Sequence, residues 1–194
     1  MGLLRAFLAS ELPPPLQDRI HTATAGLRKA LRDDLIRWVP AHNVHLTLKF
    51  LGDISPSSIE LIKQMMLTEA AAYPAFDVQV EGLGCYPTPR RPRVLWVGLK
   101  APAELTSLQR AIEAAAARLG YESEERGFSP HLTIGRVRQN ASSADLQKIR
   151  AALEQNQFGS LGSARVDAIH LFKSELRPEG SIYTRLFSAP LPEG

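Results

Sequence analysis

The stretch Val44-His45-Leu46-Thr47-Leu48-Lys49-Phe50 returns in altered form 86 positions later (His131 against His45), as Pro130-His131-Leu132-Thr133-Ile134-Gly135-Arg136. In both copies apolar and polar residues alternate, which is typical of a β-strand with one apolar and one polar face. Side chains two residues apart on a strand project from the same face. Each copy therefore predicts a strand that presents one imidazole and one hydroxyl side by side.

The helices expected along the chain recur at the same offset. A helical pattern over 15–33 has a counterpart over 101–119. A second helix is expected to begin near Ser55, where Pro56 suits the first turn, and its counterpart begins near Ser142. These correspondences predict two structurally similar halves.

Strand-like runs show the same spacing. The run 76–83 moves to 162–169, which overlaps the expected strand 164–171, and the run 93–99 moves to 179–185, which overlaps the expected strand 181–187. The strands 164–171 and 181–187 are expected to form a final hairpin. The sequence therefore predicts one α+β domain over residues 1–194, in which each half contributes one His-x-Thr strand.

The composition narrows the class of protein. With 44% hydrophobic and 22% charged residues, the chain has the composition of a globular domain, and a net charge of +3 favours an anionic partner only slightly. Neither a membrane span nor a signal peptide is expected, because no apolar run reaches about 20 residues and Arg5 interrupts the first one. Cys85 is the single cysteine, which excludes an internal disulfide and fits a reducing cytoplasm, with Cys85 expected to be buried.

Two imidazoles facing one another would suit phosphoester chemistry. Histidine has a pKa near 6.5, so one ring can accept a proton while the other donates one. The hydroxyls of Thr47 and Thr133 could donate to phosphate oxygens, and Arg136 would add a charged fork. Strict alternation points Arg136 away from Thr133, but a bulge at Gly135 would turn it back. Otherwise Arg136 is an ordinary solvent-facing residue.

Other polar residues have ordinary explanations. His42 and His45 do not present both rings on one face of a turn and strand, so a metal site is not expected. His21 and His170 are expected to be structural. Lys49 could extend the positive field of the site or could be simply exposed, and Phe50 is expected to lie in the core.

Several aromatic and basic residues are weaker candidates for contact with RNA. Tyr86, Trp96 and Tyr183 could stack on a base, although each is more often a packing residue. The densest basic cluster, Arg90, Arg91 and Arg93, could grip an RNA backbone or could be a solvated loop.

The two motifs at 45–48 and 131–134 match a doubled His-x-Thr-x signature, and the chain thereby resembles the 2H phosphoesterase superfamily. The surroundings are similar to its RNA 2′,3′-cyclic phosphodiesterase branch, historically called 2′-5′ RNA ligase. The segments that carry this similarity are 5–9, 48–52, 94–98 and 129–136. The resemblance implies a bilobal α+β fold with two pseudo-symmetric antiparallel sheets, flanked by helices, around a central active-site groove.

The resemblance also implies an activity and a partner. The family hydrolyses RNA 2′,3′-cyclic phosphate ends to 2′-phosphomonoesters without metal or other cofactor, and reverse 2′-5′ ligation is the same chemistry run backwards. The expected partner is RNA with a cyclic phosphate end or a nucleotide. No membrane is expected to be involved, and a cytoplasmic monomer is favoured.

Roles for individual residues follow from the same resemblance. His45 would be the proton donor and His131 the proton acceptor, while Thr47, Thr133 and Arg136 would bind the phosphate. The residues alone do not settle which histidine is the acid. Two alternatives stay open: another specificity within the superfamily, such as a 2′-5′ oligonucleotide or small cyclic nucleotide phosphodiesterase, and an RNA-binding or nucleotide-binding module without turnover.

Overall fold

The computed structural model describes residues 2–124, 126–177 and 180–194. Its helices are α1 (Pro14–Ala23), α2 (Ala25–Ala30), α3 (Ile59–Ala71), α4 (Ala103–Arg118) and α5 (Ser143–Gln155), with 3-10 turns η1 (Ala41–Asn43) and η2 (Pro56–Ser58). Its strands are β1 (Leu4–Glu11), β2 (Ile36–Trp38), β3 (His45–Ile54), β4 (Phe76–Thr88), β5 (Arg91–Lys100), β6 (His131–Val137), β7 (Ser160–Val166), β8 (Ala168–Arg177) and β9 (Gly180–Pro190).

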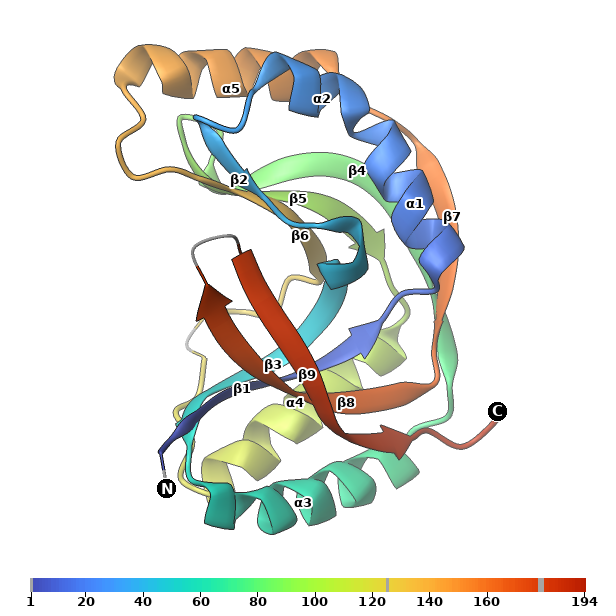
Figure 1. Cartoon of the computed structure of the whole chain (residues 1–194). Coiled ribbons are helices and arrows are strands. Elements are labelled where there is room, and N and C mark those ends of the chain that lie inside the picture. The colour runs from blue at the N-terminus through green and yellow to red at the C-terminus, as the bar shows by residue number, and fades with distance from the viewer. Residues whose placement is uncertain (1, 125, 178–179) are drawn as a thin grey trace.

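The strands form one curled sheet with the order β7-β4-β5-β6-β3-β1-β8-β9, and β2 pairs with β6. The two His-x-Thr strands are its central pair and meet at a single residue pair, Leu46 with Leu132. From that point β3 and β6 diverge, so the sheet bends into two halves with the helices on its outer side (Figure 1). The predicted α+β class is confirmed, and the two expected sheets are the two arms of one continuous sheet.

Buried apolar side chains between the sheet and the helices hold each half together. Leu46 and Leu132 are 1% and 0% exposed and point into this core. The helices present matching stripes, as in α4, where Leu105, Leu108 and Ile112 are buried. The core therefore fixes which face of β3 and β6 remains for polar side chains.

Two segments cross from one half to the other. The chain leaves β1, which lies beside β3, and then forms α1, α2 and β2 against the half that contains β4, β5, β6 and β7 (Figure 1). It leaves β5, which lies beside β6, and then forms α4 against β3 and α3. Each half thus carries the segment that leads into the other half's histidine strand.

Some boundaries differ from those expected. The run 164–171 is two strands, because the chain breaks at Asp167 between β7, which pairs with β4, and β8, which pairs with β1. β5 lies beside β6, and the strand in the corresponding position beside β3 is β1. The offset of 86 instead matched 93–99 with 181–187, which belongs to the edge strand β9, so this predicted correspondence is wrong.

The segment of the basic cluster Arg90, Arg91 and Arg93, considered above as a solvated loop, also differs. It is part of the hairpin of β4 and β5, and Cys85 is buried as expected. In the described parts of the chain, no helix combines the length and the apolar character needed to cross a bilayer.

Candidate active site

The site lies on the face of β3 and β6 that points away from the helices. Leu46 and Leu132 pair with one another and are buried, and in a strand the residues on either side of a buried one point the opposite way. His45, Thr47, His131 and Thr133 are those neighbours, and all four are partly exposed. The fold therefore brings the two predicted imidazoles and the two predicted hydroxyls onto one face, around a single cross-strand pair.

Each histidine is fixed by its own strand in the same way. Nδ1 of His45 lies 2.7 Å from the carbonyl oxygen of Asn43, and Nδ1 of His131 lies 2.8 Å from that of Ser129. A carbonyl oxygen can only accept, so each Nδ1 carries a proton and donates it. Nε2 is consequently the atom of each ring that remains free to exchange a proton with a ligand.

A tyrosine supports each imidazole edge-on. Tyr86 meets His131 with the ring centres 5.0 Å apart and the planes at 78°, and Tyr183 meets His45 at 5.3 Å and 86°. The hydroxyl of Tyr86 also bonds to the side chain of Ser129 at 2.6 Å, next to the carbonyl that holds His131. Tyr86 and Tyr183, considered above as base-stacking residues, thus lie against the two histidines.

Both histidine strands carry a bulge at the same place. In β6 the pairing with β5 skips Ile134, and in β3 the pairing with β1 skips Leu48. The bulge makes two successive residues face the core and returns the next one to the site face. The bulge predicted near Gly135 is confirmed, and Arg136 is exposed on the face of His131 and Thr133.

His45 has much more apolar surroundings than an exposed imidazole. Its ring stacks on Phe7 at 4.9 Å and 25°, and Phe172 lies 6.5 Å away. Desolvation lowers the pKa of His45 to about 4; the bond to Asn43 opposes this effect, and the positive charge of Arg136 adds to it. At neutral pH His45 is therefore uncharged, with a lone pair on Nε2.

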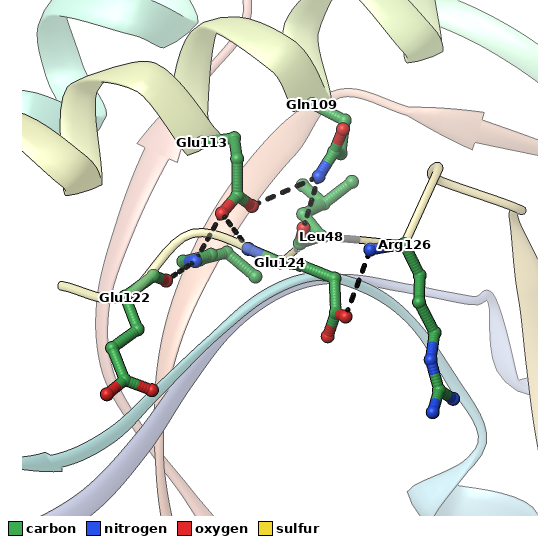
Figure 2. A network of polar contacts seen from close by, with 7 residues as sticks. Leu48, Gln109, Glu113, Glu122, Glu124 and Arg126 are labelled. Carbon is green, nitrogen blue, oxygen red and sulfur yellow. Dashed lines mark hydrogen bonds and ion pairs between the residues drawn. The ribbon is translucent and has the colours of Figure 1, made fainter.

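Lys49 takes a different role from both of those considered for it. It is 4% exposed, and its ammonium group donates to Glu113 of α4 and to the carbonyl oxygen of Glu122. Figure 2 shows Glu113 at the centre of this network, where it also accepts from the backbone N–H of Glu124 (2.8 Å) and from Gln109 (3.3 Å). Lys49 thus ties the segment before β6 to the back of β3 and does not reach the site.

Phe50 is not a core residue. It is 61% exposed and occupies in β3 the place that Arg136 occupies in β6, with its ring 6.1 Å from Phe7. Sequence alternation misplaced both Lys49 and Phe50 because it did not include the bulge at Leu48.

Of the remaining candidates, Trp96 lies close to the site, because it pairs with Thr133 and its ring is 5.3 Å from that of Tyr86. His170 is buried and bonds to Ser188 at 2.8 Å, while His42 and His21 are exposed. Arg90 and Arg91 lie at the tip of the β4–β5 hairpin and line a hollow against α5. Within the described residues, no group of three or more His, Cys, Asp or Glu side chains is placed to hold a metal ion.

The sequence was also compared with known proteins. Residues 12–177 match the model of the 2′-5′ RNA ligase superfamily. The chain belongs to this superfamily.

Relatives of this superfamily member match over nearly its whole length. A protein of Methanothermobacter thermautotrophicus named RNA 2′,3′-cyclic phosphodiesterase is 34% identical over 93% of this chain and 95% of its own. One of Thermotoga maritima with the same name is 31% identical over 98% and 97%. A crystal structure of E. coli LigT complexed with 3′-AMP covers 97% of this chain and 98% of its own, with a TM-score of 0.76 and 26% identity. The resemblance read from the two motifs is confirmed.

Some features of this superfamily member could not be read from its sequence. The carbonyls of Asn43 and Ser129 hold the rings, but backbone groups leave no mark in residue types. Phe7 could be expected only as a strand residue. The only signal for the supporting tyrosines was their aromatic character.

Proposed function

We propose that the protein is an RNA 2′,3′-cyclic phosphodiesterase that opens the cyclic phosphate to a 2′-phosphomonoester. The observation that carries this proposal is the pair of imidazoles on one face of β3 and β6, each with Nδ1 fixed on a carbonyl and Nε2 free. The names of the relatives support the same reaction.

The proposed step uses one proton acceptor and one proton donor. Nε2 of His131 takes a proton from a water molecule as the water oxygen bonds to phosphorus. The bond from phosphorus to the 3′ oxygen breaks, and Nε2–H of His45 gives its proton to that oxygen. One water is consumed in this step. At its end His45 has lost a proton and His131 has gained one, so the transfer of a proton from His131 to His45 through solvent restores the enzyme.

The phosphate oxygens need stabilisation while the negative charge on them grows. Thr47 and Thr133 lie two residues after the histidines on the same face, within the reach of a phosphoryl group bound between the rings. Arg136 returns to this face through the bulge and supplies a permanent positive charge. These groups allow the reaction without a metal ion, and we propose that none is required.

The low pKa of His45 makes its donor role dependent on the substrate. At neutral pH the ring is neutral in the folded protein, because its pKa is about 4. A bound phosphate anion raises the pKa of a neighbouring imidazole, because opposite charge favours the protonated form. His45 thus becomes an acid only when the phosphate is present. If a 5′-hydroxyl takes the place of water, the same two proton transfers let its oxygen bond to phosphorus as the bond to the 3′ oxygen breaks, which gives a 2′-5′ phosphodiester; hydrolysis dominates in water.

The assignment of acid and base can be tested with the leaving atom. His45→Ala and His131→Ala should each lower kcat on a 2′,3′-cyclic phosphate RNA by about 10² to 10⁴-fold. A substrate in which sulfur replaces the 3′ oxygen needs no proton on its leaving group. It should restore turnover to His45→Ala but not to His131→Ala. Rescue of His131→Ala instead would exchange the two roles.

Product analysis tests the reaction itself. Chromatography or phosphorus NMR of the product should show a 2′-phosphate, and EDTA should leave the rate unchanged. Turnover of 2′-5′ oligoadenylate or a small cyclic nucleotide in place of the cyclic RNA end would identify another specificity of the superfamily. Binding without cleavage over hours would show a nucleotide-binding module.

A further inference from the structure

The short strand β2 places a second arginine directly beside Arg136. In the antiparallel pair of β2 and β6, Arg37 lies opposite Arg136, with Ile36 opposite Val137 and Trp38 opposite Gly135. Residues directly opposite one another in such a pair point to the same face. Ile36 is buried and Arg37 is exposed, so Arg37 shares the site face with Arg136.

This pairing of like charges is unfavourable without an anion. Two cations directly opposite on neighbouring strands repel one another. In the described part of the chain neither Arg37 nor Arg136 has a carboxylate partner, whereas Arg32 pairs with Asp34 and Arg150 with Glu154. The fold therefore keeps two free guanidinium groups adjacent at the site, where a negatively charged ligand would relieve the repulsion.

The backbone of β2 is held firmly in this position. A Cβ on Gly135 would come within 2.7 Å of Ile36 Cγ2 and 3.0 Å of the Trp38 ring, so only glycine allows β2 to approach this closely. Arg28 covers the Trp38 ring at 4.6 Å and donates to the carbonyl oxygen of Val39 at 3.2 Å. The packing thus fixes the strand that carries Arg37.

The two arginines lie on different strands. Arg136 continues the strand of His131, and its charge contributes to the lowered pKa of His45. β5 covers one edge of β6, and β2 lies on the other edge, which β3 occupies at Leu132, so Arg37 begins one strand spacing, about 4.8 Å, from Arg136. A phosphate held between the imidazoles and Arg136 therefore leaves Arg37 available for a different phosphate.

We propose that Arg37 binds the phosphodiester on the 5′ side of the terminal nucleotide. This proposal rests on the proposed function, because a cyclic phosphate marks the 3′ end of an RNA and every other phosphate lies on the 5′ side. Arg37 then makes the enzyme selective for RNA ends over free nucleoside 2′,3′-cyclic phosphates. The substrate class is an oligonucleotide of two or more residues.

The test compares two substrates that differ by this one phosphodiester. Adenosine 2′,3′-cyclic phosphate has a single phosphate, and the dinucleotide ApA with a 2′,3′-cyclic phosphate has the additional linkage. Arg37→Gln should lower kcat/KM for the dinucleotide about tenfold, leave the mononucleoside within about twofold, and reduce the salt dependence for the dinucleotide by about one phosphate contact. Arg37→Lys should recover part of the loss because it keeps the charge.

The matched control is Arg110→Gln, which removes the same charge from an exposed position on α4, on the outer side of the sheet. It should leave both substrates unchanged. Equal losses for both substrates with Arg37→Gln, or no loss for either, would overturn the proposal. If the unmodified enzyme cleaves neither substrate, the proposed function fails, and the role of Arg37 is tested by binding alone.

Calorimetry with 3′-phosphorylated ApA should then still show a weaker complex for Arg37→Gln than for the unmodified protein. Equal affinity of the two would refute the proposed role of Arg37.

Discussion

The strands β3 and β6 are built alike for their first four residues and differ at the next two. Both read His, Leu, Thr and an aliphatic residue, both bulge at that aliphatic residue, and both then return a side chain to the site face. In β3 the following residues are Lys49 and Phe50, and in β6 they are Gly135 and Arg136. The backbone is repeated, while the two side chains after the bulge differ in size and charge.

This difference determines what packs against each strand. Gly135 leaves room for β2, which approaches closely and places Arg37 beside Arg136. Lys49 instead extends into the network of Glu113 behind β3. One half of the site is therefore basic. The other is lined by the aromatic rings around His45, so symmetric strands present an asymmetric surface to the substrate.

The largest expected effect concerns the buried ion pair of β3. Lys49→Met should lower the free energy of unfolding by about 3–5 kcal/mol, because it leaves the Glu113 carboxylate largely buried without its cation. The double variant with Glu113→Leu should recover much of this loss, since no charge is then left unpaired. Denaturant titrations measure both, and a single variant as stable as the unmodified protein would show that the network contributes nothing.

The next effect tests the close approach in β6. Gly135→Ala should cost about 1–3 kcal/mol, because the added methyl group overlaps Ile36 and pushes β2 outward. Gly159→Ala is the matched control, since nothing lies within 4 Å of its added Cβ. Activity of the folded Gly135 variant on an RNA cyclic phosphate should fall as Arg37 and Arg136 shift. Equal stability of the two variants would remove the packing argument.

A smaller effect concerns pH. The folded-state pKa of His45 is about 4, below its unfolded value near 6.5, so the unfolded chain binds more protons between these values. This contribution to stability is complete above about pH 6.5 and is lost as the pH falls toward 4. From pH 7.5 to 5, thermal unfolding should show His45→Gln losing about 2 kcal/mol less than the unmodified protein. Burial also lowers the pKa of His170, which leaves a residual slope in the same direction.

The smallest effect tests the aromatic half directly. Phe7→Leu should raise the pKa of His45 from about 4 toward its ordinary value, because the stacked ring at 4.9 Å no longer shields the imidazole from water. An NMR titration of the ring carbons measures the change. Phe172→Leu should raise it less, since that ring is 6.5 Å away. The reverse order would show that another contact sets the pKa.

The features of the site that depend on a short stretch of sequence could be predicted. Alternation placed His45, Thr47, His131 and Thr133 on polar faces, and a glycine marked the bulge in β6. The matching bulge in β3 has no such marker, because Lys49, not glycine, follows it. The contacts that could not be predicted involve segments distant in sequence. Only the folded structure shows that β2 packs over Gly135 and that Lys49 donates to Glu113.

The crossing of the lead-in segments has a consequence for how such a molecule could be assembled. The segment before β3 lies on the half of β6, and the segment before β6 is tied to β3. Neither half could therefore be excised as an intact unit. Two copies of a half-length chain would rebuild this arrangement only as an intertwined homodimer that exchanges those segments. In it, the segment before the histidine strand of each subunit would pack against the histidine strand of the other subunit.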